Sequence, residues 1–438
     1  MNASGTAILE PTGLVVPHTA GLAERYMAVR QRTQWLCAPL LAEDCVVQSM
    51  PDASPTKWHL AHTSWFFETF VLAPNATAYA PFNSHFSYLF NSYYVTVGDR
   101  HCRQNRGLLS RPTVAEIYDY RKHVDEAMLR LLSAANESLL SRLTATIEMG
   151  LHHEQQHQEL LLTDIKHAFW VNPMRPVYRE RSVEREAEVT PSRWVRFGEG
   201  IQSVGYDGSG FAFDNESPRH RVFLEPFQLS SRLVTNGEYK QFIGDGGYRR
   251  PELWLSMGWA TVEREQWQSP LYWIEQAGQW QNHTLAGLRP VSDDEPVCHI
   301  SYFEADAYAR WAGARLASEF EWETASCSLP IDGNFVDRGR LHPAPLALMP
   351  AAAGSHEEPS QMFGDVWEWT RSAYLAYPGY QPPAGALGEY NGKFMCNQFV
   401  LRGGSCATPR NHIRRTYRNF FPPDARWQFT GLRLARET

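Results

Sequence analysis

The sequence predicts an α+β protein of two domains, with a four-helix bundle followed by a domain of short strands and irregular loops. A chain of 438 residues is too long for one ordinary hydrophobic core, so two domains are expected. In residues 21–170, apolar side chains recur at helical spacing. From residue 196 onward the chain is instead rich in glycine, aromatic residues and turns, without the strand–helix alternation of a parallel sheet.

Two helices are predicted in the first part of the bundle. Residues 21–48 carry an amphipathic pattern, and Ser54, followed by proline, is predicted to cap the next helix. That helix places His62 between Trp58 and Trp65 on one largely apolar face. A histidine in such a place needs partners for its ring nitrogens, either hydrogen-bonding groups of the core or a metal ion.

A long connection and a third helix follow. Residues 74–112 are rich in aromatic and basic side chains, and the aromatic content argues against disorder in so long a loop. Thr113 and Glu116 then form a capping box, which predicts a helix to about residue 136.

The fourth helix, predicted over residues 138–169, carries two histidines on one face. His153 and His157 are four residues apart, so both imidazoles can reach one metal ion. Alone, the pair is equally consistent with a solvated polar face. With His62 presented by a second helix, a metal site with three histidine ligands becomes the better explanation. Gln156 lies about 60° from His153 around the helix, so it can face a substrate bound there.

Three further segments complete the predicted organisation. Residues 1–20 lack the apolar run of a secretion signal and are predicted to be a flexible N-terminus. Residues 171–195, with two prolines followed by a charged run, are predicted to link the bundle to a C-terminal domain over 196–438. Within that domain, helices are predicted near 236–244 and 302–312.

Composition and charge restrict the classes of partner. A net charge of -7 gives no electrostatic reason to expect nucleic acid or an anionic membrane as a partner. No stretch approaches the roughly 18 apolar residues of a membrane span. The seven cysteines are scattered and lack C-x-x-C spacing, which predicts reduced thiols in a cytoplasmic protein. The sequence does not indicate an oligomeric state.

Several motifs of the C-terminal half carry a family resemblance. They lie at residues 218–222, 234–239, 311–323, 364–370, 402–405 and 431–436. Together they resemble the formylglycine-generating-enzyme (sulfatase-modifying factor) domain, which implies a C-type-lectin-like fold. Formylglycine generators carry two cysteines around a Tyr-Arg pair, whereas Arg414 and Asn419 stand in those places around Tyr417 and Arg418. This departure argues against formylglycine generation.

The N-terminal half resembles a DinB-type four-helix bundle through residues 58–63 and the histidines of the fourth helix. A DinB-like bundle followed by this C-terminal domain is similar to the iron(II)-dependent sulfoxide synthases of ergothioneine and ovothiol biosynthesis. The resemblance implies that His62, His153 and His157 bind Fe(II), with positions left for a thiolate, an imidazole and O2. The family's motif includes Glu159, but helix geometry turns that side chain about 120° or more away from both histidines. We therefore predict that Glu159 is not a metal ligand.

The reaction implied by the resemblance joins the sulfur of cysteine to an imidazole carbon and oxidises that sulfur to a sulfoxide. In ergothioneine synthesis the acceptor is hercynine (trimethylhistidine), attacked at C2 between the ring nitrogens, and the product is a hercynyl-cysteine sulfoxide. In ovothiol synthesis the acceptor is histidine, attacked at the other ring carbon. The choice between the two rests on the resemblance.

A phenol is the acid expected near the metal in this family. Tyr93 and Tyr94 are the first candidates, because their loop belongs to the bundle that carries the histidines. Tyr377 and Tyr380 are the alternatives from the C-terminal domain, and Tyr380 is also a candidate substrate contact. The alternative for the Tyr-Tyr pair is ordinary packing, and for Tyr93 or Tyr94 taken singly packing is the better interpretation.

Two groups of residues are expected to contact the substrates. Arg103 and Arg106 are predicted either to bind the donor's carboxylate through charge-assisted hydrogen bonds or to form a solvated basic loop. Relatives that use γ-glutamylcysteine carry Asn-Trp-Asp where Asn419, Phe420 and Phe421 stand here. Phe421 cannot bind the dipeptide's amino group, so free cysteine is the predicted donor. Aromatic faces such as Phe420 and Phe421 suit the quaternary ammonium of hercynine.

Two other classes of function stay open. In a DinB-type thiol transferase, the three histidines would hold zinc or nickel and oxygen would not be needed, but the C-terminal domain would then have no role. A lectin-like fold can also serve only as a carbohydrate- or protein-binding module, in which case the histidines would be dispensable.

Overall fold

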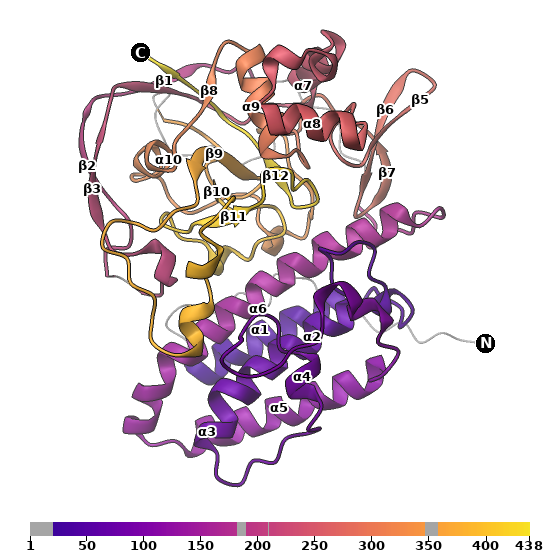
Figure 1. The fold of residues 1–438 in the computed structure, drawn as a ribbon, viewed down its shortest axis with the longest axis vertical. Helices are drawn as coiled ribbons and strands as arrows, with labels where there is room; N and C mark the ends of the chain where they lie inside the picture. Colours follow the sequence, from indigo (N-terminus) through magenta and orange to yellow (C-terminus); the bar gives the residue numbers. More distant parts are fainter. Residues whose placement is uncertain (1–20, 182–189, 209, 347–357) are drawn as a thin grey trace.

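Four helices form the N-terminal part of the protein and pack as a bundle (Figure 1). They are α1 (Leu22–Cys37), α2 (Thr56–Phe67), α5 (Val114–Ala134) and α6 (Glu137–Val171). Short helices α3 (Ala73–Asn75) and α4 (Phe86–Leu89) lie in the connection between α2 and α5. The structure is a computed structural model, which describes residues 21–181, 190–208, 210–346 and 358–438. The predicted N-terminal segment and residues 182–189 of the predicted linker lie outside them.

Helix boundaries confirm one predicted cap and correct two other expectations. Thr113 and Glu116 form the predicted capping box at the start of α5. The first helix ends at Cys37 rather than near residue 48, because Pro39 lacks an N–H and its ring clashes with a continuing helix. Ser54 does not cap α2, since Pro55 takes that position. The backbone N–H of Ser54 instead donates to Asp164 Oδ2 (2.8 Å).

Helix α2 lies in the middle of the bundle, and all twelve of its residues are buried. A helix that is buried on all sides has no face exposed to water, so other elements must pack closely around it. Gly150 provides this closeness on α6, because a Cβ atom there would lie 2.6 Å from Cε1 of Phe67. The short separation brings the histidines of α6 to the histidines of α2.

A buried ionic network joins three helices of the bundle. Glu154 on α6 accepts hydrogen bonds from Arg30 on α1 (2.9 Å) and from Arg121 on α5. Thr33 donates a third hydrogen bond to the same carboxylate (2.6 Å). Burial raises the pKa of Glu154, but the guanidinium groups of Arg121 and Arg30 outweigh it and lower that pKa to about 2. Glu154 therefore stays ionised in the core beside His153.

The C-terminal part contains short antiparallel strands with helices between them, above the bundle in Figure 1. One sheet has the order β1-β4-β13-β8 and a second has the order β11-β10-β9-β12, in which only the β9–β12 pair is parallel. A two-stranded ribbon (β2-β3) and a three-stranded sheet (β5-β6-β7) lie beside them. The strands are β1 (Trp194–Phe197), β2 (Gly200–Val204), β3 (His220–Leu224), β4 (Phe227–Ser230), β5 (Trp273–Gln276), β6 (Gln279–Thr284), β7 (Gly287–Pro290), β8 (Arg315–Leu316), β9 (Trp367–Ala373), β10 (Phe399–Arg402), β11 (Asn419–Phe421), β12 (Thr430–Gly431) and β13 (Leu434–Glu437).

In the described part of this domain, four α-helices accompany these strands. The two predicted helices are α7 (Asn236–Gly244) and α9 (Tyr302–Trp311). The sequence did not predict α8 (Ser256–Glu265) or α10 (Glu319–Ala325), because these segments are short and mix charged with aromatic residues. A helical bundle followed by this mixed domain confirms the predicted α+β class.

Helix α6 runs between the two parts of the molecule (Figure 1) and carries much of the contact between them. Its Gln155 and Lys166 side chains contact Asn411 (2.5 Å) and His299 (2.6 Å) of the C-terminal domain. The segment after α6 returns to the bundle, where the Tyr178 hydroxyl donates to the carbonyl of Leu36 (2.5 Å). The boundary of the linker stays a prediction.

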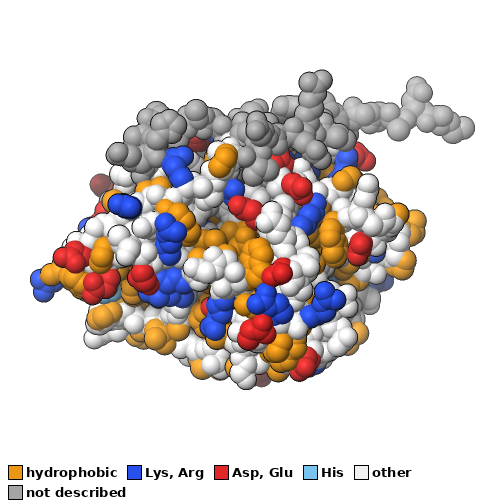
Figure 2. Space-filling view, turned by 90° about the horizontal axis from the view of Figure 1, so that it is seen from above, with side chains coloured by type: hydrophobic (Ala, Val, Ile, Leu, Met, Phe, Trp, Pro, Cys, Tyr) orange, Lys and Arg blue, Asp and Glu red, His pale blue; other side chains and the backbone are white. Residues whose placement is uncertain are grey.

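On the face shown in Figure 2, basic and acidic side chains are interspersed without a large field of one sign. No helix among the described residues is both long and apolar enough to cross a bilayer. All seven cysteines are free thiols.

Candidate metal centre and interdomain cavity

His62, His153 and His157 meet where α2 and α6 pack together. One ring nitrogen from each lies within 4.8 Å of the other two. His62 is fully buried, and its ring stacks between Trp58 (4.5 Å between ring centroids) and Trp65 (5.5 Å). The two tryptophans thus hold the first imidazole in place while helical spacing aligns the other two.

The ring nitrogens of His62 and His153 are spaced as two ligands of one metal ion. The Nδ1–H of His62 donates to the carbonyl of Phe90 (2.6 Å), which leaves the Nε2 lone pair free. This Nε2 atom lies 3.1 Å from Nε2 of His153. Two metal–imidazole bonds of about 2.1 Å at right angles would place their nitrogens about 3.0 Å apart. The separation therefore fits two neighbouring ligands of one ion.

The charge state of the three rings also suits a metal. Burial lowers the pKa of His153 to about 3. Burial, together with neighbouring histidines, lowers the pKa of His62 and of His157 well below the ordinary value. Neutral imidazole is the form that coordinates metal ions. These three residues can hold a divalent transition-metal ion.

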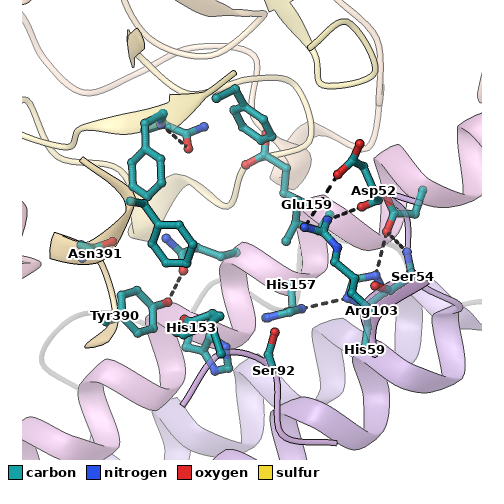
Figure 3. Close-up of a pocket in the computed structure, with 18 of the residues that line it drawn as sticks. Asp52, Ser54, His59, Ser92, Arg103, His153, His157, Glu159, Tyr390 and Asn391 are labelled. Atoms are coloured by element: carbon teal, nitrogen blue, oxygen red, sulfur yellow. Dashed lines mark hydrogen bonds and ion pairs between the residues drawn. The ribbon is translucent and has the colours of Figure 1, made fainter. Parts of the chain in front are cut away.

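A cavity of about 770 Å³ opens beside the histidines, between the bundle and the C-terminal domain. Figure 3 shows His153 and His157 on α6 at one wall and Tyr390 and Asn391 of the C-terminal domain close to them. Clefts between domains are frequent ligand sites, and this volume suits small molecules. Both domains supply lining residues, which include Trp58, His59, Ser92, Tyr93, Arg103, Arg106, Gln156, Phe213, Tyr417, Asn419, Phe420 and Phe421.

The four candidate tyrosines lie in different places. Tyr93 lines the cavity, whereas Tyr94 packs behind it against Trp65 (5.6 Å between ring centroids). The Tyr377 hydroxyl donates to Glu319 (3.2 Å) inside the C-terminal domain, and the Tyr380 hydroxyl donates to Asp214 (2.6 Å). Neither of these two residues lines the cavity.

The two candidate arginines also differ. Arg103 is exposed at the rim and bonds the backbone carbonyl of Asp52. Arg106 is buried, lies over the Trp58 ring (3.3 Å) and donates to Ser54 Oγ (2.9 Å). Its Nε–H has no partner within the described residues. Burial lowers the pKa of Arg106 to about 9, so it still carries its charge at neutral pH.

Gln156 lies in the wall of the cavity and connects the two domains. Its Nε2 donates to the Tyr417 hydroxyl (2.6 Å), and its Oε1 accepts from the Tyr390 hydroxyl. Burial raises the pKa of Tyr390 well above that of a free phenol, and the ring lies 5.8 Å from the ring of His153. Sequence reasoning missed Tyr390, because the segment around it has no periodic pattern that would place it near the histidines.

Asn419, Phe420 and Phe421 form β11 and line the opposite wall. Phe420 stacks on Tyr374 at 4.0 Å between ring centroids. Arg414, which stands where a formylglycine generator has cysteine, bonds Glu216 through Nε (3.1 Å) and Nη2 (2.5 Å). An arginine held in this way forms part of the scaffold.

Glu159 points away from the metal centre, as helix geometry predicts. Its carboxylate accepts hydrogen bonds from Trp367 (2.8 Å), Ser405 (2.5 Å) and Thr408 (2.9 Å), all in the C-terminal domain. Burial raises the pKa of Glu159 and these hydrogen bonds oppose the rise. These hydrogen bonds stabilise the packing of α6 against the C-terminal domain.

We expect Glu159→Ala to lower the free energy of unfolding by about 1–3 kcal/mol, because three buried donors lose their acceptor. Metal content per folded protein should stay unchanged. Thermal melting and elemental analysis measure the two effects, and Glu159→Gln, which keeps an acceptor oxygen, is the milder control. Loss of metal without loss of stability would instead make Glu159 a ligand.

Comparison with known proteins agrees with this architecture. The DinB superfamily model matches residues 25–161, and the sulfatase-modifying factor enzyme 1-like domain matches residues 180–341 and 355–438. Hercynine oxygenase of Mycolicibacterium thermoresistibile is 32% identical over 97% of this chain and 96% of its own length. Hercynine oxygenase of Mycobacterium tuberculosis is 32% identical over 90% of this chain and 93% of its own length. Formylglycine-generating enzyme of Bos taurus is 24% identical over 56% of this chain and 75% of its own length.

The matches to both halves and the two nearly full-length relatives confirm the resemblance found in the sequence. The chain therefore belongs to the hercynine oxygenase family, oxidoreductases of ergothioneine biosynthesis that join a DinB-superfamily bundle to a sulfatase-modifying-factor-like domain.

Proposed function

We propose that this protein is an Fe(II)- and O2-dependent sulfoxide synthase that joins the thiol of cysteine to C2 of hercynine. The observation that carries the proposal is the cluster of three histidines in the wall of an interdomain cavity. Sequence similarity to hercynine oxygenases over nearly the whole chain supports hercynine as the acceptor. A cavity of about 770 Å³ can hold both amino-acid substrates together.

The proposed reaction consumes one hercynine, one cysteine and one O2. The thiol S–H and the imidazole C2–H bonds break, and a C–S bond forms. One oxygen atom ends on sulfur as the sulfoxide, and the other leaves as water with the two hydrogens. Of the four electrons that O2 accepts, two come from C–S bond formation and two from oxidation of the sulfur. Iron(II) held by the three imidazoles supplies the redox chemistry for this step.

Arg106 is the proposed anchor for the cysteine carboxylate. Its guanidinium lies at the cavity and is oriented by Trp58 and Ser54. Carboxylates bind such a donor group through charge-assisted hydrogen bonds. Arg103, at the exposed rim, is proposed to attract the same charge as the substrate enters.

Gln156 is the proposed contact for the hercynine imidazole. Tyr390 and Tyr417 fix the orientation of its amide, and His157 is the next residue on α6. The aromatic rings of Phe213, Tyr390 and Phe420 also line the cavity. Their faces suit a trimethylammonium group, which has no hydrogen-bond donor of its own.

Tyr93 is the proposed proton donor at the cavity, and Tyr94 supports its ring from behind (4.7 Å between ring centroids). We expect Tyr93→Phe to slow sulfoxide formation by about 100-fold, which is typical of losing a general acid or base. Single-turnover rates measured with Tyr93→Phe, Tyr94→Phe and Tyr390→Phe test the assignment. An undiminished rate in Tyr93→Phe, with a large loss in Tyr390→Phe, would transfer the role to Tyr390.

Free cysteine is the proposed sulfur donor, because Phe421 offers no charge to the amino group of a γ-glutamyl residue. In a mixture of equal cysteine and γ-glutamylcysteine, we expect the cysteine product to dominate. Phe421→Asp should shift the product ratio towards the dipeptide, by about tenfold or more for one new charge-assisted hydrogen bond of about 1.5–3 kcal/mol. Phe421→Asn is the uncharged control. Preference of the parent protein for the dipeptide would reject this donor.

The whole proposal is tested with anaerobically purified protein loaded with Fe(II). Cysteine, O2 and either hercynine or histidine are then supplied, and the product is identified by NMR. We expect O2 consumption and a C2-linked sulfoxide from hercynine only. A product from histidine would indicate an ovothiol-type synthase, and turnover with zinc and without O2 would indicate a thiol transferase.

A further inference from the structure

His59 links the metal centre to a buried carboxylate that plays no part in the proposed reaction. Its Nδ1 atom lies 2.8 Å from Nδ1 of His157, a contact drawn in Figure 3, and its Nε2 atom lies 3.0 Å from Oδ2 of Asp164. His59 and Asp164 are only 3% and 7% exposed. The backbone N–H of Ser54 donates to the same Asp164 oxygen (2.8 Å), which fixes the carboxylate from a second side.

The chemistry of the three groups determines which one donates each hydrogen bond. An ionised carboxylate only accepts, so His59 donates its Nε2–H to Asp164. Neutral His59 then has a lone pair on Nδ1, and His157 donates its own Nδ1–H to it. The remaining nitrogen of His157, Nε2, is left with its lone pair exposed. This is the nitrogen available to a metal ion shared with Nε2 of His62 and Nε2 of His153.

We propose that His59 and Asp164 are positioning residues that hold His157 in the tautomer and orientation needed to bind the metal. The inference rests on the proposed metal site and deepens it. Ligand histidines generally donate their second N–H to an acceptor, and such acceptors improve metal binding. Here the acceptor is a second histidine, itself oriented by a carboxylate.

The three ligand histidines differ in this respect. The second nitrogen of His62 bonds a backbone carbonyl, which no side-chain substitution removes. The second nitrogen of His153 has no partner within the described residues. Of the three, only His157 has its second nitrogen bonded to a side chain. The proposal therefore predicts that substitution of His59 or Asp164 acts on the metal through this one ligand.

The test uses the full chain, purified without metal and titrated anaerobically with Co(II), a stable substitute for Fe(II) with visible absorption. We expect His59→Ala to weaken Co(II) binding about 10–100-fold and to change the absorption spectrum. Asp164→Asn should weaken binding by about tenfold, because the amide is a poorer acceptor for His59. His59→Asn places an acceptor oxygen near the former Nδ1 position and should recover much of the affinity. His123→Ala, which removes a histidine of α5 that bonds the Ala80 carbonyl, is the matched control and should leave binding unchanged.

The outcomes separate this inference from the proposed function. If the parent protein binds Co(II) and His59→Ala binds it equally well with the same spectrum, the positioning role is rejected while the metal site stands. If the parent protein binds no Co(II), the metal site itself is rejected. If both His59 variants lose melting temperature and affinity together, with Asp164→Asn unchanged, His59 has only a structural role. Should His59→Ala fail to fold, the affinity of Asp164→Asn decides.

Discussion

The substitution His62→Ala is expected to abolish sulfoxide formation and to remove most of the bound iron. His62 supplies one of three imidazoles, and it is the one that α2 contributes from across the bundle. Substituting a residue that hydrogen-bonds a ligand weakens metal binding by about 10–100-fold. Losing a ligand itself should weaken it more. Iron content after anaerobic reconstitution, together with O2 consumption in the presence of cysteine and hercynine, measures both effects.

Folding has to be separated from metal loss in this experiment, because the alanine leaves a cavity between Trp58 and Trp65. His62→Gln fills more of this space and should still fail to bind iron. The control variant His123→Ala, at a half-buried position on α5, should keep the iron content and activity of the parent protein. Full activity in both His62 variants would contradict the three-histidine centre and favour a binding module.

Glu154→Gln is expected to lower the free energy of unfolding by about 3–5 kcal/mol, because it leaves the buried Arg121 without a counter-charge and leaves Arg30 with Asp125 alone. Arg30 and Arg121 come from α1 and α5, so the loss should loosen all three helices together. Hydrogen exchange of amides in α1, α5 and α6 during urea titration is the suitable measurement, since the two domains can unfold separately.

Glu148→Gln provides the matched control on the same helix. Glu148 also accepts a hydrogen bond from an arginine of α1 (Arg25, 2.7 Å), but both partners are about one quarter exposed. A partly exposed pair of this kind contributes about 0–1 kcal/mol. Equal losses in the two variants would show that burial of Glu154 adds nothing to the network.

The Glu154 carboxylate also makes the free energy of unfolding depend on pH. The folded-state pKa of Glu154, about 2, lies below its ordinary value of 4.5. The contribution of ionised Glu154 to the free energy of unfolding is therefore complete above about pH 4.5. It is lost progressively as the pH falls towards 2. In Glu154→Gln this part of the pH dependence should disappear, which unfolding experiments between pH 2 and pH 6 can measure.

Local sequence patterns predicted the bundle well, because helical periodicity and capping act over only a few residues. The Thr113 capping box is an example, and so is the four-residue spacing of His153 and His157. The angular spacing of residues around a helix is enough to exclude Glu159 from the ligand set, and its carboxylate bonds the C-terminal domain instead.

Prediction failed where a contact depends on segments far apart in the sequence. Tyr390 and Tyr417 bond Gln156 across separations of 234 and 261 residues. Both lie in irregular segments outside any long helix or strand, so no periodic pattern indicates their neighbours. The Ser54 cap was wrong for a similar reason, because its hydroxyl oxygen accepts a hydrogen bond from Arg106, which is distant in the sequence.

The sequence by itself determined the order of the two domains, the family and the histidine set, since these follow from motifs and from spacing within a helix. Only the tertiary structure decided which side chains surround those histidines. Packing of α6 against both domains brings Tyr93, Arg106 and Tyr390 to one cavity and places Tyr377 and Tyr380 elsewhere. The same packing joins His59 and Asp164 to His157. Such neighbours depend on how helices and loops fill shared space, which a one-dimensional pattern does not specify.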